Sequence, residues 1–378
     1  MKKLMTLTAS VMLANSAMAA DADTQAQIDA LKAQVAALAD TLEQQAAAPA
    51  NPVYIGGYGE MHLNLKQGQD NMIDYHRFVL FFGKEFNERT RFFSEFELEH
   101  SLAGDGKPGE VELEQAYVEY DVNSDLTAKA GLFLVPVGIL NETHEPETFY
   151  GVERNNVESK IIPTTWWEGG AALTADVADG LAIDVAVHSG LNAATFDDDG
   201  ALVGVNSLRS SRQKVAEATA NKAAYTARVK YTAIPGLELA ATLQYQDDIL
   251  QGAGDDEIGA RLTEVHAVYQ NNGFGLRALA AQWNLDSDVE DAVSGASKQR
   301  GFYVEPSYRI NETVGVFARH SNWDNSAGDS ADSVYRQNDI GVNYWLAETA
   351  VLKADYYRQK RQGDLIAAGY NLGVGFSF

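Results

Sequence analysis

The sequence predicts an all-β fold: a transmembrane antiparallel β-barrel of about 16 strands, preceded by a short N-terminal coiled-coil helix. Three observations lead to this prediction. Apolar and polar residues alternate with a period of two along most of the chain, and short turns alternate with longer polar connections. The chain also opens with an export signal, and no later stretch is apolar for long enough to form a membrane helix.

The closing stretch shows the period of two most clearly. Apolar or aromatic residues alternate there with small or polar ones: Tyr370, Leu372, Val374, Phe376 and Phe378 against Asn371, Gly373, Gly375 and Ser377. In a strand this pattern places one set of side chains on each face. An aromatic closing strand that ends in Phe378 resembles the assembly signal of bacterial outer-membrane β-barrels, so we expect the barrel-assembly machinery to bind it. The alternative is an edge strand of a soluble sheet.

The first residues predict a secretory signal peptide over 1–19. Lys2 and Lys3 precede an apolar run, and Ala17 and Ala19 stand at the A-x-A spacing of a cleavage site. The chain has no cysteine and a formal charge of -24. A balance this acidic argues against nucleic acid as a partner, because a phosphate backbone needs a basic surface.

Residues 20–46 predict a periplasmic coiled coil. The apolar residues Ile28, Leu31, Val35, Leu38 and Leu42 follow the three-four spacing of a heptad seam. Because so short a helix is marginal on its own, it needs partners, and a single amphipathic helix on another surface is the alternative. Pro49 and Pro52 mark residues 47–52 as a linker.

The barrel is predicted over 53–378. We expect strands near 53–66, 74–86, 90–101, 111–122, 126–135, 166–178, 180–190, 222–233, 236–247, 259–270, 273–285, 298–310, 313–324, 335–347, 349–360 and 364–378. Short turns such as 123–125 and 271–272 alternate with long connections such as 136–165 and 191–221. This alternation is typical of outer-membrane barrels, which have short periplasmic turns and long outer loops, and a soluble β-sandwich does not predict it. An even strand count places both chain ends in the periplasm.

Three runs resemble a known family. They are "YHRFVLFFGKEFNERTRFFSEFELEHSL" (75–102), "ELEQAYVEYDV" (112–122) and "AGLFLVPVGILNETHEPETFYGVERN" (130–155). They resemble the phosphate-selective porin O/P-like superfamily, and the branch with an N-terminal coiled coil is similar to siderophore-uptake porins. The resemblance implies a trimeric, sixteen-stranded porin whose third outer loop folds into the pore. The arginines and lysines that line phosphate-selective pores are not clearly present, so phosphate specificity does not carry over.

Strand alternation predicts which charged residues face the lumen. The pore-lining candidates are Arg77, Arg91, Glu95, Glu97, Glu119, Arg228, Lys230, Arg309, Arg319 and Lys353. Over all lumen-facing positions carboxylates outnumber basic groups, which predicts weak cation preference or near-neutrality. For most of these residues, ion pairing that supports the barrel wall is the competing interpretation, and an anion path along Arg77, Arg228, Lys230 and Arg309 is a further one.

The connection 136–165 is the candidate constriction loop, because so long a connection usually carries function. Its charged residues are Glu142, His144, Glu145, Glu147, Glu153, Arg154, Glu158 and Lys160. A divalent cation could bind the group Glu142, His144, Glu145 and Glu147, but one histidine without regular ligand spacing favours no metal site. Trp166 and Trp167, at the end of the loop, are expected in the aromatic girdle at the membrane interface.

These expectations describe an outer-membrane porin of a Gram-negative bacterium that passes small hydrophilic solutes or ions by diffusion. The alternatives are a ligand-specific uptake porin for an organic anion, phosphate or an iron chelate (siderophore), and a mainly structural barrel. No catalytic set is visible, so we expect neither an enzyme nor a cofactor. The expected partners are outer-membrane lipid and further copies of the same chain, with which it forms a homotrimer.

Overall fold

The computed structural model describes residues 53–378, apart from 197, 200–201, 206–207, 254–255 and 287–294. The predicted signal peptide, coiled coil and linker fall in 1–52, outside the described residues. Within the described part of the chain, no helix has the length and apolar character needed to cross a bilayer.

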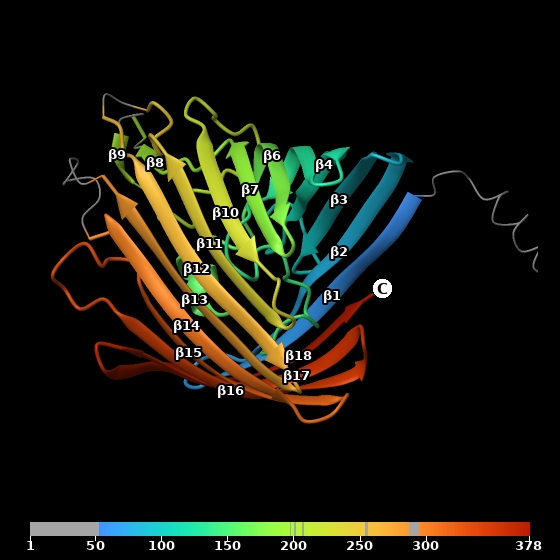
Figure 1. Ribbon diagram of the computed structural model, residues 1–378. Coiled ribbons are helices and arrows are strands. Elements are labelled where there is room, and N and C mark those ends of the chain that lie inside the picture. The colour runs from blue at the N-terminus through green and yellow to red at the C-terminus, as the bar shows by residue number, and fades with distance from the viewer. Residues whose placement is uncertain (1–52, 197, 200–201, 206–207, 254–255, 287–294) are drawn as a thin grey trace, which may run out of the picture. The chain divides into compact units, whose positions relative to one another are not determined.

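The described chain forms a closed antiparallel barrel of 16 strands, which confirms the predicted fold class (Figure 1). The barrel strands are β1 (Val53–Lys66), β2 (Met72–Asn87), β3 (Thr90–Glu99), β4 (Val111–Asn123), β5 (Leu126–Leu134), β6 (Trp167–Ala178), β7 (Leu181–His188), β10 (Ala224–Tyr231), β11 (Leu237–Gln246), β12 (Ala260–Asn271), β13 (Phe274–Leu285), β14 (Lys298–Arg309), β15 (Val314–Asp324), β16 (Tyr335–Ala347), β17 (Ala350–Arg361) and β18 (Asp364–Ser377). Each pairs with its neighbours along the chain, except that β7 pairs with β10 and β18 closes on β1.

The connection between β7 and β10 contains two further strands that the sequence did not predict. β8 (Ala194–Phe196) and β9 (Leu202–Val205) form a separate two-stranded sheet. They lie at the end of the barrel opposite the C-terminus (Figure 1). The expected irregular loop over 191–221 is therefore partly a hairpin, and residues from its later part contact the inside of the barrel.

The last residue extends the pairing of β1 with β18 that closes the barrel. Phe378 donates its backbone N–H to the carbonyl of Gly57 at 2.9 Å, and its own carbonyl accepts from the Gly57 N–H at 3.1 Å. The Phe378 ring stacks on Phe78 with ring centres 6.0 Å apart. Because β18 is the last strand, these contacts join the two ends of the sheet.

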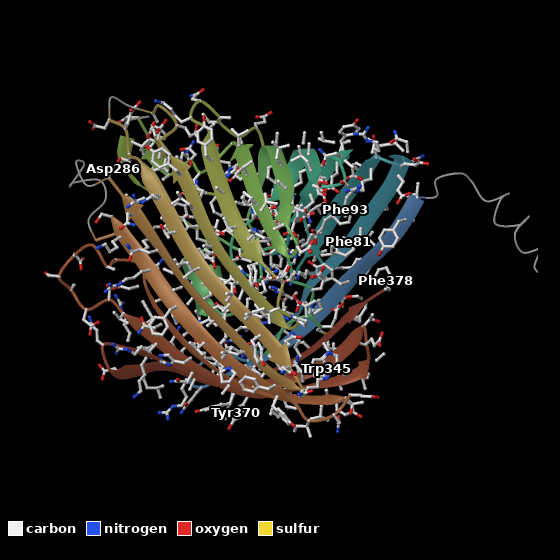
Figure 2. The ribbon with its side chains drawn as sticks, viewed as in Figure 1. Phe81, Phe93, Asp286, Trp345, Tyr370 and Phe378 are labelled. Carbon is white, nitrogen blue, oxygen red and sulfur yellow. The ribbon has the colours of Figure 1, made fainter. Side chains whose placement is uncertain are left out.

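The two faces of the wall differ as the period of two predicts. On β10 the side chains of Tyr225 and Val229 are exposed on the outside, while those of Thr226 and Arg228 are buried inside. Tyr370 on β18 is likewise exposed on the outside of the wall (Figure 2). An outer face of large apolar side chains is what contact with lipid requires.

Part of the barrel interior is apolar, which the sequence did not predict. The largest buried cluster combines residues of the β5–β6 connection with inward residues of β12 and β13, among them Ile161, Leu262 and Trp283. The Trp166 side chain is fully buried in this cluster, and Trp167 is also buried. The expectation that these two tryptophans lie in an interface girdle is therefore wrong. Trp166 packs in the interior cluster, and the ring N–H of Trp167 donates to the carbonyl of Lys214 in the β7–β10 connection.

Candidate functional site

The β5–β6 connection folds into the barrel and contacts the wall around most of its circumference. Its residues form hydrogen bonds with inward side chains of many strands: Asn64 on β1, Arg77 on β2, Arg228 on β10, Trp283 on β13, Tyr303 on β14, Arg319 on β15, Asn343 on β16, Lys353 on β17 and Ser377 on β18. This segment, residues 135–166, is called the inserted loop below. It narrows the lumen.

Two buried side chains give the inserted loop its path. The Asn141 amide group donates to the carbonyls of Val135 and Trp166 at 2.8 and 2.9 Å, and its oxygen accepts from the Trp166 N–H at 2.7 Å. Asn141 therefore ties together the two ends of the loop. The Glu158 carboxylate, on the short helix α2 (Asn156–Lys160), accepts from the N–H groups of Ile139 and Leu140 at 2.6 Å each. These bonds satisfy backbone donors that would otherwise be buried unpaired.

Several predicted pore-lining cations form buried or half-buried ion pairs. Arg77 lies 2.6 Å from Glu60, and Arg319 lies 3.1 Å from Glu305 and 3.4 Å from Asp339. The remaining pairs are those of Arg228 with Asp184 and Glu142, and of Arg91 with Glu119 and Asp121. These contacts match the wall-pairing interpretation, because the carboxylates neutralise the guanidinium charges locally.

The other pore-lining candidates lie at different heights. Glu95 and Glu97 are buried on β3, and Lys230 is half-buried on β10. Lys353 donates to the carbonyl of Gly151 in the inserted loop at 2.8 Å. Arg309 lies at the short-turn end of β14, 3.6 Å above the ring centre of Trp345. The three arginines of the predicted anion path, Arg77, Arg228 and Arg309, therefore belong to separate local contacts.

The charged residues predicted for the constriction loop also lie apart from one another. Glu142 pairs with Arg228 on β10, and Glu147 accepts a hydrogen bond from Ser377 on β18. His144 points at β3 and β4, where its Nε2 lies 3.3 Å from Glu95 and 3.6 Å from Glu114. The group of Glu142, His144, Glu145 and Glu147 considered for a cation is therefore not assembled, because successive residues point to different walls.

Two cavities lie within the barrel, and the inserted loop lines both. The first, of about 470 Å³, is lined at the long-loop end by residues of β1 to β4 and by Phe149, Val152, Glu153 and Arg154. The second, of about 480 Å³, is lined by short-turn residues such as Arg309 and by Glu147, Thr148 and Tyr150. Residues 147–153 thus face both cavities, which makes this segment the candidate constriction. Glu153 accepts from Asn64 at 2.9 Å and lies 3.3 Å from His62.

In the first cavity the carboxylates equal the lysine and arginine side chains in number, and three histidines line it as well. Seven carboxylates line it (Glu60, Asp74, Glu97, Glu99, Glu112, Glu114 and Glu153), and so do seven cationic groups (Lys66, Arg77, Arg154, Lys160, Arg209, Arg212 and Lys214). Arg209, Arg212 and Lys214 come from the β7–β10 connection, and the sequence did not single them out. The available signal was three basic residues close together in one long connection. That spacing does not show whether their side chains point into the lumen.

Five of these cations form no salt bridge with any residue in the described part of the chain: Lys66, which lies on β1, and four that lie on connections. Arg154 donates to the hydroxyl of Thr165 at 2.8 Å, and Arg209 donates to the carbonyls of Ser159 and Thr164. Arg212 donates to the Thr165 carbonyl, and Lys160 lines the cavity with an exposed side chain. We call Arg154, Lys160, Arg209 and Arg212 the basic cluster.

The members of the basic cluster repel one another. Burial, followed by the positive charges of Arg212 and Arg154, lowers the pKa of Arg209 to about 10. Burial and then the charge of Arg77 lower the pKa of Arg154 below its usual range. Both groups remain charged at neutral pH, so an anion in the cavity would reduce this repulsion.

The closed barrel, the inserted loop and the polar cavities together define the fold of an outer-membrane porin. The anion-selective porin of Comamonas acidovorans has a TM-score of 0.63 and 12% identity, over 87% of this chain and 100% of that porin. The trimer form of OmpT, an outer membrane protein of Vibrio cholerae, has a TM-score of 0.58 and 12% identity, over 87% of this chain and 100% of that protein.

The chain is also similar in amino-acid sequence to another protein. It is 30% identical over 351 residues to an Aquifex aeolicus (strain VF5) protein described as "Uncharacterized protein", and the match covers 84% of this chain and 78% of that protein. The chain belongs to the same family as this Aquifex aeolicus protein. No family model matches the chain.

Proposed function

We propose that this protein is an outer-membrane porin of a Gram-negative bacterium, through which small hydrophilic solutes diffuse passively. The observation that carries the proposal is the inserted loop, which contacts the wall around most of its circumference and lines both polar cavities with residues 147–153. A barrel with a dry, fully packed interior would not retain charged cavities of this size, since unpaired charges are costly without water.

The basic cluster supports a mild preference for anions. Strand alternation places more carboxylates than basic groups in the lumen and therefore predicted weak cation preference or near-neutrality. We propose the opposite sign because Glu60 is paired with Arg77, and Glu112 with Lys214. The cations of the basic cluster keep their charge available to a passing solute. In confined water a few uncompensated charges outweigh more numerous paired ones. The fold neighbour from Comamonas acidovorans is itself described as anion-selective, which is compatible with this preference.

A second candidate function is selective uptake of an organic anion, phosphate or an iron chelate, the ligand classes suggested by the resemblance to phosphate-selective porins. The observation that favours it is that the three arginines of the basic cluster line one cavity of about 470 Å³. Arginine suits carboxylate and phosphate groups because its planar guanidinium binds them through two parallel hydrogen bonds.

Planar-bilayer recording on the purified protein tests both candidates. A diffusion porin gives ohmic conductance in potassium chloride. In a salt gradient its reversal potential should have the sign of a channel that passes anions more readily than cations. A ligand-specific channel gives a current that phosphate or an organic anion blocks in a saturable way. Absence of any conductance from correctly folded protein would contradict the porin proposal and favour a structural barrel.

We also propose that the porin is a homotrimer, joined in part by the predicted coiled coil. The trimer form of the Vibrio cholerae fold neighbour supports the state of assembly. Changing Leu31→Asp and Leu38→Asp together would place carboxylates in the apolar seam, so the trimer should dissociate at a lower temperature. An unchanged dissociation temperature on native gels would assign the seam to another periplasmic partner.

A further inference from the structure

Three buried side chains converge at the junction of the inserted loop with the wall. They are Glu95 of β3, Glu114 of β4 and His144 of the inserted loop, and each has at most 3% of its surface exposed. One ligand atom from each lies within 4.8 Å of the others. The His144 Nε2 atom is 3.3 Å from Glu95 Oε1 and 3.6 Å from Glu114 Oε2. This group is called the Glu95–Glu114–His144 cluster.

A β-bulge places Glu114 in this cluster. Gln115 pairs with Glu95 and Leu113 pairs with Phe96, so Glu114 is the extra residue of β4 and has no partner opposite it on β3. Without the bulge, simple alternation from Glu119 would place Glu114 on the outer face of the barrel. Bulges that redirect a single side chain are frequent beside functional sites.

Two polar atoms of the cluster are unsatisfied. Both His144 Nε2 and Glu114 Oε2 are buried without a hydrogen-bond partner among the described residues. The His144 Nδ1 atom lies 3.3 Å from the Asn141 carbonyl, which only accepts, so the ring proton belongs on Nδ1. The Nε2 atom then faces two carboxylates. Two buried carboxylates need a positive charge beside them, and either a second proton on the His144 ring or a metal ion that takes the place of this proton at Nε2 can supply it.

The protein supplies no Lys or Arg for this purpose within the described residues. Neither Glu95 nor Glu114 has a salt bridge other than the one to His144. The nearby Arg77 is engaged by Glu60 at 2.6 Å and by the His144 carbonyl at 2.9 Å. The surroundings instead orient the ligands: Gln115 donates to Glu95 Oε2 at 2.7 Å, and Tyr58 donates to Glu95 Oε1 at 3.3 Å.

We propose that the Glu95–Glu114–His144 cluster binds one divalent transition-metal ion of the Zn²⁺ type, which fastens the inserted loop to the wall. Nε2 lies 3.3 and 3.6 Å from the two oxygens, separations that allow an ion at the usual Zn²⁺ bond lengths of about 2.0–2.2 Å between Nε2 and either oxygen. One imidazole and two carboxylates suit Zn²⁺, and their charges cancel those of the ion. The contact of the other ring nitrogen with a backbone carbonyl is the usual support of a metal-bound histidine.

The ion has a route to the site and an open position. Glu114 also lines the first cavity, so the cluster borders water at the long-loop end. With three protein ligands, the fourth position of a tetrahedral site remains for a water molecule. The proposal concerns the attachment of the loop and is independent of which solute passes through the barrel.

The test uses the purified full-length porin in detergent, stripped with a chelator and then titrated with Zn²⁺. One Zn²⁺ per chain should bind, and the heat-modifiable barrel should unfold at a higher temperature when the ion is present. In Glu114→Gln and in His144→Gln the affinity should fall at least tenfold, with the barrel still folded. Titration with Co²⁺ adds a direct readout, because a four-coordinate site gives intense visible absorption bands that the two variants should lose.

The control is a second group of possible ligands in the first cavity, Asp74, His76 and His100. His100→Gln should leave the stoichiometry of one Zn²⁺ per chain and the Co²⁺ spectrum unchanged. Zn²⁺ binding that survives both ligand changes in folded protein, or that is lost only in His100→Gln, would overturn the proposal. So would a stripped wild-type barrel that binds no Zn²⁺ and shows no change in unfolding temperature.

Discussion

Asp355 of β17 accepts a hydrogen bond from the backbone N–H of Val152 at 2.7 Å, and both groups are buried. The other oxygen of Asp355 accepts a hydrogen bond from Asn371 at 2.7 Å, so both oxygens of the carboxylate are hydrogen-bonded. Lys353, which lies two residues before Asp355 on the same strand, donates to the carbonyl of Gly151. The backbone of the candidate constriction is therefore fixed by β17, a strand that lies 203 residues further along the chain.

Asp355→Ala should loosen the constriction without unfolding the barrel. The change leaves the Val152 N–H buried and unpaired, which costs about 1–3 kcal/mol. Residues 147–153 should then move more, and the open-channel current in planar bilayers should become noisier. Asp364→Ala, which removes an exposed carboxylate at the start of β18, is the matched control. Equal noise in both variants would show that Asp355 does not hold the loop.

Lys160→Glu should shift the ion preference toward cations. Lys160 lies at the cavity without a salt bridge among the described residues, so reversing its charge acts directly on passing ions. The cation-to-anion permeability ratio should rise roughly twofold to fivefold, as expected for two charge units several ångströms from the path. Reversal potentials in a potassium chloride gradient measure this ratio. Lys107→Glu, an exposed change outside the cavity linings, should leave the ratio unchanged.

Arg319→Met should destabilise the barrel far more than Arg91→Met. Arg319 is buried between Glu305 and Asp339, so its removal leaves two buried carboxylates without their cation, at a cost of about 3–5 kcal/mol. The Arg91 pair is more exposed, and comparable pairs contribute about 0–1 kcal/mol. Heat-modifiability gels would show the difference as a lower unfolding temperature. Equal shifts for both variants would mean that water reaches Arg319 freely.

Phe378→Ser should lower the amount of assembled barrel while leaving its conductance unchanged. The ring loses its stack on Phe78 and an apolar surface that is 58% exposed, but the backbone bonds to Gly57 remain possible. The apolar side chain is also the feature that we expect the assembly machinery to bind. Folded protein in outer-membrane fractions is the measurement. Wild-type levels in the variant would remove the proposed role of this residue in assembly.

Much of the fold could be predicted from the sequence, because strand faces follow from local geometry. The two-residue period is set by the backbone itself, so alternation in stretches such as 224–231 or 370–378 identifies both a strand and its outer face. The count of strands followed from the turns between them. The β8–β9 hairpin was missed, because its strands are only three and four residues long.

Less of the candidate site could be predicted, and particular residues show why. Arg77 and Arg319 have the inward face that alternation assigned, but only the structure shows that carboxylates on β1, β14 and β16 neutralise them. Glu114 was missed because a bulge changes the parity of β4. Arg209 and Arg212 were missed because a connection has no period from which direction can be read.

The sequence by itself determined that this chain forms a barrel, which stretches are its strands and which connection is long enough to enter the lumen. These properties depend on residues within a few positions of one another. Only the tertiary structure decided which charges are paired, where the basic cluster lies and how Glu95, Glu114 and His144 converge. Those contacts depend on strand register and on the path of a loop through the barrel interior, and both are set by packing between residues far apart in the chain.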